Sequence, residues 1–280
     1  MISLLYCGND KVFDGILTSV LSLLKRSRRD EPISLHLYTM DVSHLKADYL
    51  PISESQASFL DRILKEYNPE SRALLHRVDD LYREYFDGCP NEGAYCSPYT
   101  LIRLFADLVD GMPDKLLYLD ADLMFCRDVH LLWDTDVSTY EYAAARDHYG
   151  KFLINPNYIN AGVLLFNMKR IKESGLLRKA RALIREKKLT FADQSAIIRS
   201  TTAKKMLSQR FNDQKFLYKN TVIRHFSKRL FYFPYPHTDN VKQWQVSRIH
   251  KVFGYYSFDD ILYEYLYYKK AFEKEKDEHA

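Results

Sequence analysis

The sequence predicts an α/β fold, in which helices flank a central sheet, followed by a C-terminal helical appendage. Through the first half of the chain, aliphatic runs of strand length alternate with amphipathic segments of helical spacing, a pattern typical of a sheet flanked by helices. The 280 residues suffice for one large α/β domain or two small ones, and we favour one domain with an appendage.

The pattern of apolar residues predicts each element in turn. Strands are expected at residues 2–7, 33–40, 73–78 and 116–120, and again at 141–147, 159–171 and 221–226. Helices are expected at residues 12–27, 57–67, 97–109 and 191–200. From residue 255 the chain is dense in tyrosine and then in charge, which predicts a helix that frays at its end. We expect the aromatic face of this helix to pack on the domain.

One apolar run carries two carboxylates near its middle, because the segment LLYLDADLMF contains Asp120 and Asp122. A carboxylate in apolar surroundings is costly unless it is paired, hydrogen-bonded or bound to a metal. Residues two apart on a strand point to the same face, so we expect the two carboxylates to converge. The spacing alone is weak evidence, since 24 aspartates would form about two such triplets by chance. The second triplet, from Asp134 to Asp136, lacks the apolar run and is interpreted as a turn.

Composition and the cysteines exclude several classes of protein. A hydrophobic content of 46% with 28% charged residues is typical of a soluble protein. No run is long enough for a membrane-spanning helix, and MISLLYCGND lacks the features of a signal peptide, so we expect a cytoplasmic location. Without a Cys-x-x-Cys pair, the cysteines are expected to be reduced and structural; they are Cys7, Cys89, Cys96 and Cys126.

The net charge of +4 is unevenly distributed along the chain. Residues 215 to 251 contain eight Lys and Arg against one acid, a local charge of +7. Such a segment suits phosphates, nucleic acid or an anionic membrane, and is equally compatible with a solvated surface. No nucleic-acid-binding motif accompanies it, so we expect no nucleic-acid partner. Peripheral membrane contact stays open, although the acidic end of the chain makes anionic lipid less suitable there.

Eight phrases in a fixed order resemble glycosyltransferase family 8, the retaining sugar-nucleotide-dependent transferases that include bacterial lipooligosaccharide galactosyltransferases and glycogenin. The phrases are LYCGND, YTLIRLF, LLYLDADLMF, LLWDTD, AAARD, INAGVLLFN, FADQSAI and IRHF. The resemblance implies a Rossmann-like nucleotide-diphospho-sugar transferase fold of the GT-A type with a mixed central sheet. It also implies a catalytic domain over residues 1–230, followed by a basic and aromatic appendage over residues 231–280.

The resemblance implies that Asp120, Asp122 and His225 bind a divalent cation. An oxygen-rich site suits Mn²⁺ or Mg²⁺, and the added imidazole favours Mn²⁺. This cation and the donor diphosphate would compensate the two carboxylates, and the cation would neutralise charge on the departing diphosphate. By residue type alone, His225 would more simply be a hydrogen-bonded core histidine.

The same resemblance implies where the UDP-sugar donor binds. Asn9 and Asp10 are expected to contact the uracil and ribose, although both residue types also cap helices well. Arg103, which its helical position alone would leave on a solvated surface, is expected to reach the donor sugar or phosphates.

The resemblance also implies contacts with the sugar part of the donor. Asp147 and the turn of Asn160, Ala161 and Gly162 are expected to bind sugar hydroxyls, with the glycine permitting close backbone approach. Ala121, between the two aspartates, belongs to the same expected donor site.

Asp193 and Gln194 are the expected catalytic residues, lying next to the anomeric carbon in the family. Helix capping is the simpler role for Asp193. Because the family retains configuration, either a side chain attacks the back face or the acceptor attacks on the face of the departing diphosphate. Gln194 is a poor nucleophile, so same-face attack is favoured, with a diphosphate oxygen accepting the acceptor proton. Gln194 would then steady the oxocarbenium-like state.

The sequence departs from the family pattern after His225. Many relatives carry a phosphate clamp resembling Gly-Pro-x-Lys-Pro-Trp there, whereas this chain reads HFSKRLFYFPYPHTDNVKQW. Lys228 or Arg229 is expected to supply the phosphate charge from a differently folded loop.

The resemblance therefore implies a retaining enzyme that moves galactose or glucose from a UDP-sugar to a glycan, glycolipid or lipopolysaccharide-like acceptor. A haloacid-dehalogenase-like phosphatase also uses Asp-x-Asp, but that motif usually lies near the N-terminus, and Met124 stands where it has Thr or Val. A non-catalytic sugar-nucleotide or glycan-binding protein could keep the same fold, because fold does not prove activity.

Overall fold

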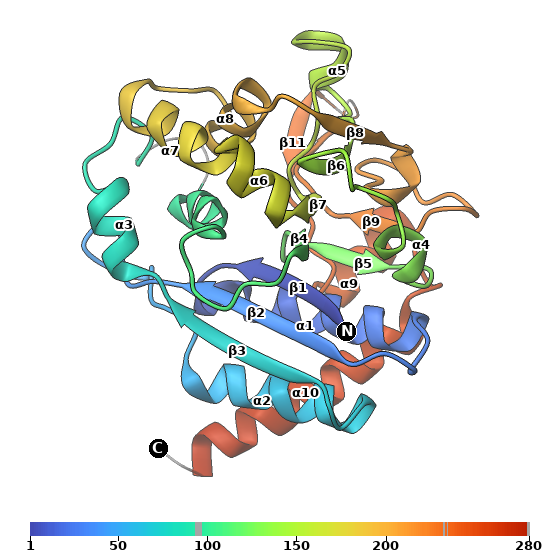
Figure 1. The fold of residues 1–280 in the computed structure, drawn as a ribbon. Coiled ribbons are helices and arrows are strands. Elements are labelled where there is room, and N and C mark those ends of the chain that lie inside the picture. Colours follow the sequence, from blue (N-terminus) through green and yellow to red (C-terminus); the bar gives the residue numbers. More distant parts are fainter. Residues whose placement is uncertain (93–96, 232, 234, 279–280) are drawn as a thin grey trace.

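The computed structural model describes residues 1–92, 97–231, 233 and 235–278 (Figure 1). Its centre is a seven-stranded sheet in the order β3-β2-β1-β4-β7-β6-β8. Strands β1 to β4 are mutually parallel, β7 runs antiparallel to β4 and β6, and β8 is parallel to β6. The sheet is therefore mixed, as expected. The strands are β1 (Ile2–Cys7), β2 (Ile33–Thr39), β3 (Arg72–Arg77), β4 (Lys115–Leu119), β6 (Tyr142–Ala145), β7 (Val163–Asn167) and β8 (Lys204–Leu207).

Helices cover both faces of this sheet (Figure 1). One face packs against α1 (Phe13–Arg26), α2 (Glu54–Tyr67) and α10 (Asp259–Glu278). The other packs against the 3₁₀ helix η2 (Pro98–Phe105), α3 (Asp79–Tyr85), α6 (Met168–Ser174), α7 (Leu176–Glu186) and α8 (Ala192–Ser200). Successive residues of β1 enter opposite cores: Leu4 packs with the first group and Leu5 with the second. This alternation explains why the strand is apolar at almost every position.

Smaller elements complete the chain around the sheet. Two antiparallel ribbons lie outside it, one formed by β5 (Leu123–Phe125) with β9 (Ile223–His225) and one by β10 (Arg229–Phe231) with β11 (His237–Asp239). The expected strand at 221–226 therefore belongs to a ribbon and not to the central sheet. The short helices are η1 (Asp10–Val12), α4 (His130–Trp133), α5 (Gly150–Leu153), η3 (Gln209–Phe211), α9 (Val246–Arg248) and the π-type η4 (Ile249–Phe253).

The C-terminal helix packs on the domain, as expected. The ring of Phe272 on α10 lies 4.9 Å from that of Phe13 on α1, and Lys269 donates to Asp14 at 2.8 Å. Tyr265 is 1% exposed and joins the core that contains Leu4. The boundary near residue 230 stays a prediction. Within the described residues, no helix combines the length and apolarity needed to span a bilayer.

Candidate functional site

The aspartate pair lies in a turn between two short strands. Strand β4 ends at Leu119 and β5 begins at Leu123, so Asp120, Ala121 and Asp122 form the connection. The expectation that the two carboxylates share one face of a strand is therefore wrong in its geometry, because the strand ends before them. Their convergence is nevertheless present, since one ligand atom each from Asp120, Asp122 and His225 lie within 4.8 Å of one another.

The pairing of β5 with β9 places His225 next to this turn. In the β5–β9 ribbon Leu123 pairs with His225, and the backbone N–H of Phe226 donates to the Asp122 carbonyl at 2.8 Å. The Nε2 atom of His225 lies 3.0 Å from Asp122 Oδ1 and 3.8 Å from Asp120 Oδ2. The ring is 3% exposed, so it is a core histidine whose Nε2 faces two carboxylates.

Two carboxylates and one imidazole nitrogen fit the ligand preferences of Mn²⁺, and a glycine packs directly against two of these three side chains. A Cβ on Gly162 would lie 2.5 Å from His225 Cε1 and 2.8 Å from Asp120 Oδ2, closer than real Cβ contacts come. Any larger residue there would displace the group of ligands. The donor set and this close approach both fit a divalent cation.

A segment that the sequence analysis did not assign closes this turn from the other side. Lys242 donates to the Asp122 carboxylate, and Gln243 donates to the Ala121 carbonyl at 2.7 Å. A Cβ on Gly15 would lie 2.7 Å from the ring of Trp244, so α1 and Trp244 pack tightly. The stretch after His225 itself ends in Lys-x-Trp, a signal that could have identified this segment.

Lys242 also determines the charge state of the nearest carboxylate. Burial alone would raise the pKa of Asp122, but the Lys242 ammonium and His225 outweigh it and hold this pKa far below its usual range. Asp122 is therefore ionised throughout the pH range in which the protein would act.

Arg103 lies beneath the site and is 2% exposed, so the solvated surface position suggested by its helix alone is wrong. Its guanidinium lies 3.1 Å from Asp120 Oδ1 and 3.3 Å from Asp193 Oδ2, and it donates to the Ala161 carbonyl at 2.7 Å. Burial raises the pKa of Asp193, with Arg103 acting in the opposite sense. Arg103 thus connects three parts of the site: residues 120–122, called the metal-site turn; residues 160–162, called the sugar-site turn; and the start of α8.

Asn9 and Asp10 lie where β1 ends, at the carboxyl edge where ligands of such sheets bind. Asn9 precedes the helical turn η1 but makes no side-chain cap, so capping does not explain it. Asp10 Oδ1 is buried without a hydrogen-bond partner among the described residues. A buried carboxylate oxygen of this kind is costly unless a ligand or water donates to it.

The residues expected at the donor sugar are joined by hydrogen bonds. Asp147 accepts from the Gly150 N–H at 2.6 Å and from the Asn160 side chain at 2.9 Å. The Ala161 N–H donates to Gln194 Oε1 at 3.0 Å. Because a backbone N–H can only donate, the Gln194 atom that it contacts must be the amide oxygen. The NH₂ group of Gln194 can then donate to a ligand.

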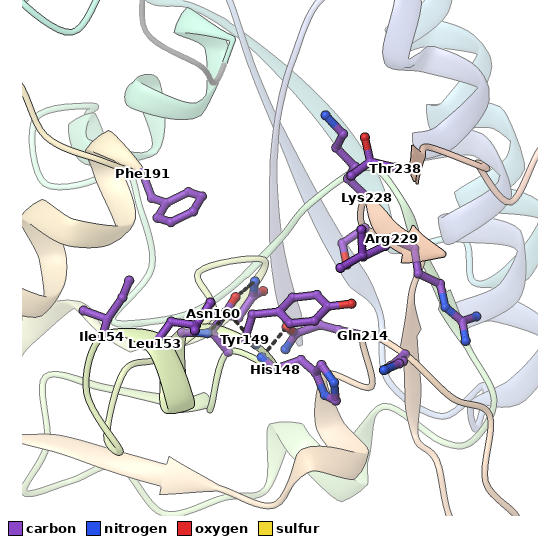
Figure 2. A pocket seen from close by; sticks show the side chains of 15 residues that line it. His148, Tyr149, Leu153, Ile154, Asn160, Phe191, Gln214, Lys228, Arg229 and Thr238 are labelled. Carbon is purple, nitrogen blue, oxygen red and sulfur yellow. Dashed lines mark hydrogen bonds between the residues drawn. The ribbon is translucent and has the colours of Figure 1, made fainter. Parts of the chain in front are cut away.

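A cavity of about 420 Å³ opens beside Asp147 and Asn160. In Figure 2, Phe191 and Ile154 lie on one side, Lys228 and Arg229 lie on the other, and Asn160 is between them. Phe191 has a left-handed backbone at φ 53°, unusual for a non-glycine residue, and immediately precedes α8, which carries Asp193 and Gln194. Of the expected donor residues, Asp147, Asn160 and Lys228 line this cavity, whereas Asp193 and Gln194 are not among its lining residues. The Arg229 guanidinium lies over the rings of Phe231 and Phe253.

The cysteines complete the account of the predicted residues. Cys7, Cys89 and Cys126 are free thiols, as expected, and burial raises the pKa of Cys7 above its usual range. Cys96 lies outside the described residues.

Comparisons with known proteins place this chain in a family. Residues 3–230 match the model described as Glycosyl transferase family 8. Glucoside xylosyltransferase 1 of Mus musculus is 27% identical over 241 residues, which cover 80% of this chain and 51% of that protein. Glycosyltransferase GlyA of Streptococcus pneumoniae is 38% identical over 103 residues, 35% of this chain and 14% of that protein. The chain thus spans about half the length of the glucoside xylosyltransferase it matches.

Solved structures share the fold. Galactosyltransferase LgtC, in complex with donor and acceptor sugar analogues, superposes with a TM-score of 0.61 at 19% identity, over 93% of this chain and 100% of that chain. Glycosyltransferase GlyE of Streptococcus pneumoniae superposes with a TM-score of 0.62 at 19% identity, over 94% of this chain and 63% of that chain. The GT-A type of fold is therefore confirmed, and with 228 matched residues of 280 the chain belongs to glycosyl transferase family 8.

Proposed function

We propose that this protein is a retaining hexosyltransferase that moves galactose or glucose from a UDP-sugar to a glycan, glycolipid or lipopolysaccharide-like acceptor. The observation that carries the proposal is the convergence of Asp120, Asp122 and His225 beside the cavity that Asp147 and Asn160 line. A carboxylate and imidazole cluster of this kind suits a diphosphate bound through a divalent cation, and the adjoining cavity is large enough for sugar rings.

The donor would lie along the carboxyl edge of the sheet. Asn9 and Asp10 would bind the uridine, and the unpartnered Oδ1 of Asp10 suits a hydroxyl donor such as the ribose. Asp120, Asp122 and His225 would hold Mn²⁺, or Mg²⁺ in its place, which when bound supplies positive charge next to the diphosphate. The described structure favours Lys242 over Lys228 as the nearest ammonium to this position, because Lys242 already contacts Asp122. Lys228 stays a predicted donor contact at the rim of the cavity.

Asp147, Asn160, Ala161 and Gly162 would orient the donor sugar. Arg103 stays a predicted donor contact, and it already pairs with Asp120 and Asp193 and donates to the Ala161 carbonyl. We therefore propose that Arg103 holds these groups in place for the donor.

Retention by same-face attack fits the side chains around Gln194. Its amide oxygen is engaged by the Ala161 N–H, and the buried Asp193 carboxylate is paired with Arg103, so neither is a free nucleophile. In the proposed step the acceptor hydroxyl oxygen bonds to the anomeric carbon as the bond to the diphosphate oxygen breaks. The hydroxyl proton passes to that diphosphate oxygen. The amide oxygen of Gln194 has a second lone pair besides the one that Ala161 engages, and this lone pair would steady the positively charged sugar.

The acceptor and the location stay proposals. We propose a cytoplasmic protein with a peripheral contact at the inner face of the membrane. The tyrosine-rich α10 packs one face on α1 and leaves Tyr263 and Tyr267 at 60% and 71% exposure on the other. Large apolar side chains are exposed at Phe152 and Leu153 of α5, at 78% and 80%, and are the better candidates.

The test is release of UDP from a panel of UDP-sugars, including UDP-xylose, with Mn²⁺ and with EDTA. Metal-dependent release from UDP-galactose or UDP-glucose, abolished by Asp122→Asn, would support the proposal. Asp136→Asn is the matched control, because Asp136 belongs to the other Asp-x-Asp triplet and is exposed in the connection between α4 and β6.

Two other outcomes would contradict the proposal in different ways. Release from UDP-xylose alone would replace the hexose by a pentose. Calorimetric binding of UDP-sugars without turnover, even with glycan and glycolipid acceptors added, would favour the alternative of a non-catalytic sugar-nucleotide or glycan-binding protein.

A further inference from the structure

Asn212 is a completely buried polar residue between the metal-site turn and the sugar-site turn. It follows the 3₁₀ helix η3 and is 0% exposed. Its backbone carbonyl accepts hydrogen bonds from Gln209 at 2.7 Å and from Gln214 at 3.3 Å, so the residue is held at its backbone. Neither the motif pattern nor the proposed function assigns it a role.

The side chain of Asn212 makes one hydrogen bond to each site. One amide atom lies 2.9 Å from Nδ1 of His225, and the other lies 2.9 Å from Oδ1 of Asn160. The two contacts together connect a candidate metal ligand with a candidate sugar ligand through a single planar amide.

The donors and acceptors in this series of hydrogen bonds can be assigned, because the first donor is a backbone N–H. Oδ1 of Asn160 accepts from the backbone N–H of Gly162 at 3.0 Å, so it is an oxygen, and Nδ2 of Asn160 donates to the Asp147 carboxylate. The Asn212 atom that faces Asn160 Oδ1 must therefore be the NH₂ group. Its oxygen then faces His225 Nδ1, which must carry a hydrogen.

The consequence concerns the other nitrogen of His225. Because Nδ1 donates to Asn212, the neutral imidazole that a cation would bind has its lone pair on Nε2, which lies 3.0 Å from Asp122 Oδ1. Hydrogen bonds to the second ring nitrogen commonly set the orientation and basicity of metal-binding histidines.

We propose that Asn212 is a positioning residue that couples the metal site to the donor-sugar site. Its oxygen holds the His225 ring with Nε2 toward the cation, and its NH₂ holds Asn160 toward the sugar. The role rests on the metal and donor sites of the proposed function, but it can fail while those sites stand.

Two substitutions separate the two hydrogen bonds. Asn212→Leu keeps the approximate size and removes both. Asn212→Asp keeps an acceptor for His225 Nδ1 but places a carboxylate oxygen against Asn160 Oδ1, so only the sugar-side bond is lost. The readouts are calorimetric affinities for Mn²⁺ alone, and for UDP and UDP-galactose in saturating Mn²⁺.

For Asn212→Leu we expect Mn²⁺ affinity to fall about 10- to 100-fold, the usual range for such supporting residues. For Asn212→Asp we expect Mn²⁺ affinity to recover to within about threefold of the unsubstituted protein, a rescue by the retained acceptor. UDP binding to this variant should be unchanged, whereas the additional affinity of UDP-galactose over UDP should be lost.

The matched control is Asn91→Leu. Asn91 is 1% exposed and makes three hydrogen bonds to backbone groups of Ile184, Lys187 and Leu189, remote from the site. It should lose stability with no change in Mn²⁺ affinity. Comparable loss of Mn²⁺ affinity in both leucine variants would reduce Asn212 to a structural role and overturn the proposal.

Two further results bear on the proposal. Unchanged Mn²⁺ affinity in Asn212→Leu overturns it while leaving the metal site intact, whereas no Mn²⁺ binding by the unsubstituted protein overturns the metal site itself. If Asn212→Leu does not fold, Asn212→Asp decides alone, because unchanged selectivity between UDP-galactose and UDP would overturn the coupling.

Discussion

Replacing Gly162 with alanine adds one methyl group at the point where the metal-site turn and the sugar-site turn are closest. The added Cβ would lie 2.5 Å from His225 Cε1, 2.8 Å from Asp120 Oδ2 and 3.0 Å from Asn160 Oδ1. Ordinary contacts of a Cβ begin near 3.4 Å, so the imidazole would have to move by about 1 Å. Gly162 is not among the described glycines with positive φ, so the backbone itself tolerates alanine and the effect is steric.

The ring has little room to make that movement. His225 is 3% exposed, paired in the β5–β9 ribbon and hydrogen-bonded at Nδ1 to Asn212. Added methyl groups in packed interiors cost about 1–3 kcal/mol of folding free energy. A misplacement of about 1 Å at reacting groups costs on the order of 100-fold in rate. We expect Gly162→Ala to fold, to bind Mn²⁺ at least ~10-fold more weakly, and to release UDP about 100-fold more slowly.

Calorimetry with Mn²⁺ and the UDP-release assay measure this directly, and chemical denaturation measures stability. Gly111→Ala is the control, because its Cβ meets nothing within 4 Å while its φ of +75° costs roughly 1 kcal/mol of strain. It should lose comparable stability with normal Mn²⁺ affinity. Retention of Mn²⁺ affinity within about threefold in Gly162→Ala would refute the inferred packing between this glycine and the ligands.

Two other predictions test the charge arrangement. Lys242→Met should weaken UDP binding in saturating Mn²⁺ by about 10- to 100-fold, because the variant lacks the ammonium group beside the proposed diphosphate position. The control Lys205→Met, whose ammonium contacts the Asp136 carbonyl away from the site, should not change UDP affinity. Equal UDP affinities in the two variants would contradict the role of Lys242. Burial, with the nearby His76 and Arg72, lowers the pKa of His36 to about 4, so the unfolded chain binds a proton between about pH 6.5 and pH 4 that the folded chain does not. Stability should therefore be fully present above about pH 6.5 and should fall as the pH decreases to 4, by up to about 3 kcal/mol, and urea titrations of His36→Phe should lose most of this slope.

Local sequence patterns predicted much of the sheet because the cause of those patterns is local. Strands buried on both faces need apolar side chains at nearly every position, and β1, β2 and β4 all lie within or close to their expected ranges. Strand β8 escaped prediction because KKML is short and carries two lysines, and it becomes a strand only by pairing with β6. Pairing between distant segments leaves little trace in either segment alone.

The site divides in the same way. Asp120, Asp122 and His225 could be named from motif phrases, and the structure brings them together, although by a turn and a ribbon and not along a strand. Lys242 was missed because it lies 120 residues from Asp122 and beyond a hairpin that displaces it from the motif position. The sequence shows which residues are charged, but it does not show which residue forms an ion pair with each of them.

The sequence by itself therefore determined which chemical groups this protein has and after which predicted strand each group comes. Apolar periodicity and family phrases are local patterns, so they can be identified from the sequence alone. Only the tertiary structure decided which of these groups meet. Arg103 turned out to be a buried link between two carboxylates, and Asn212 a link between two sites. The physical reason is that burial and hydrogen-bond direction belong to the packed molecule, where each donor must find an acceptor from another part of the chain.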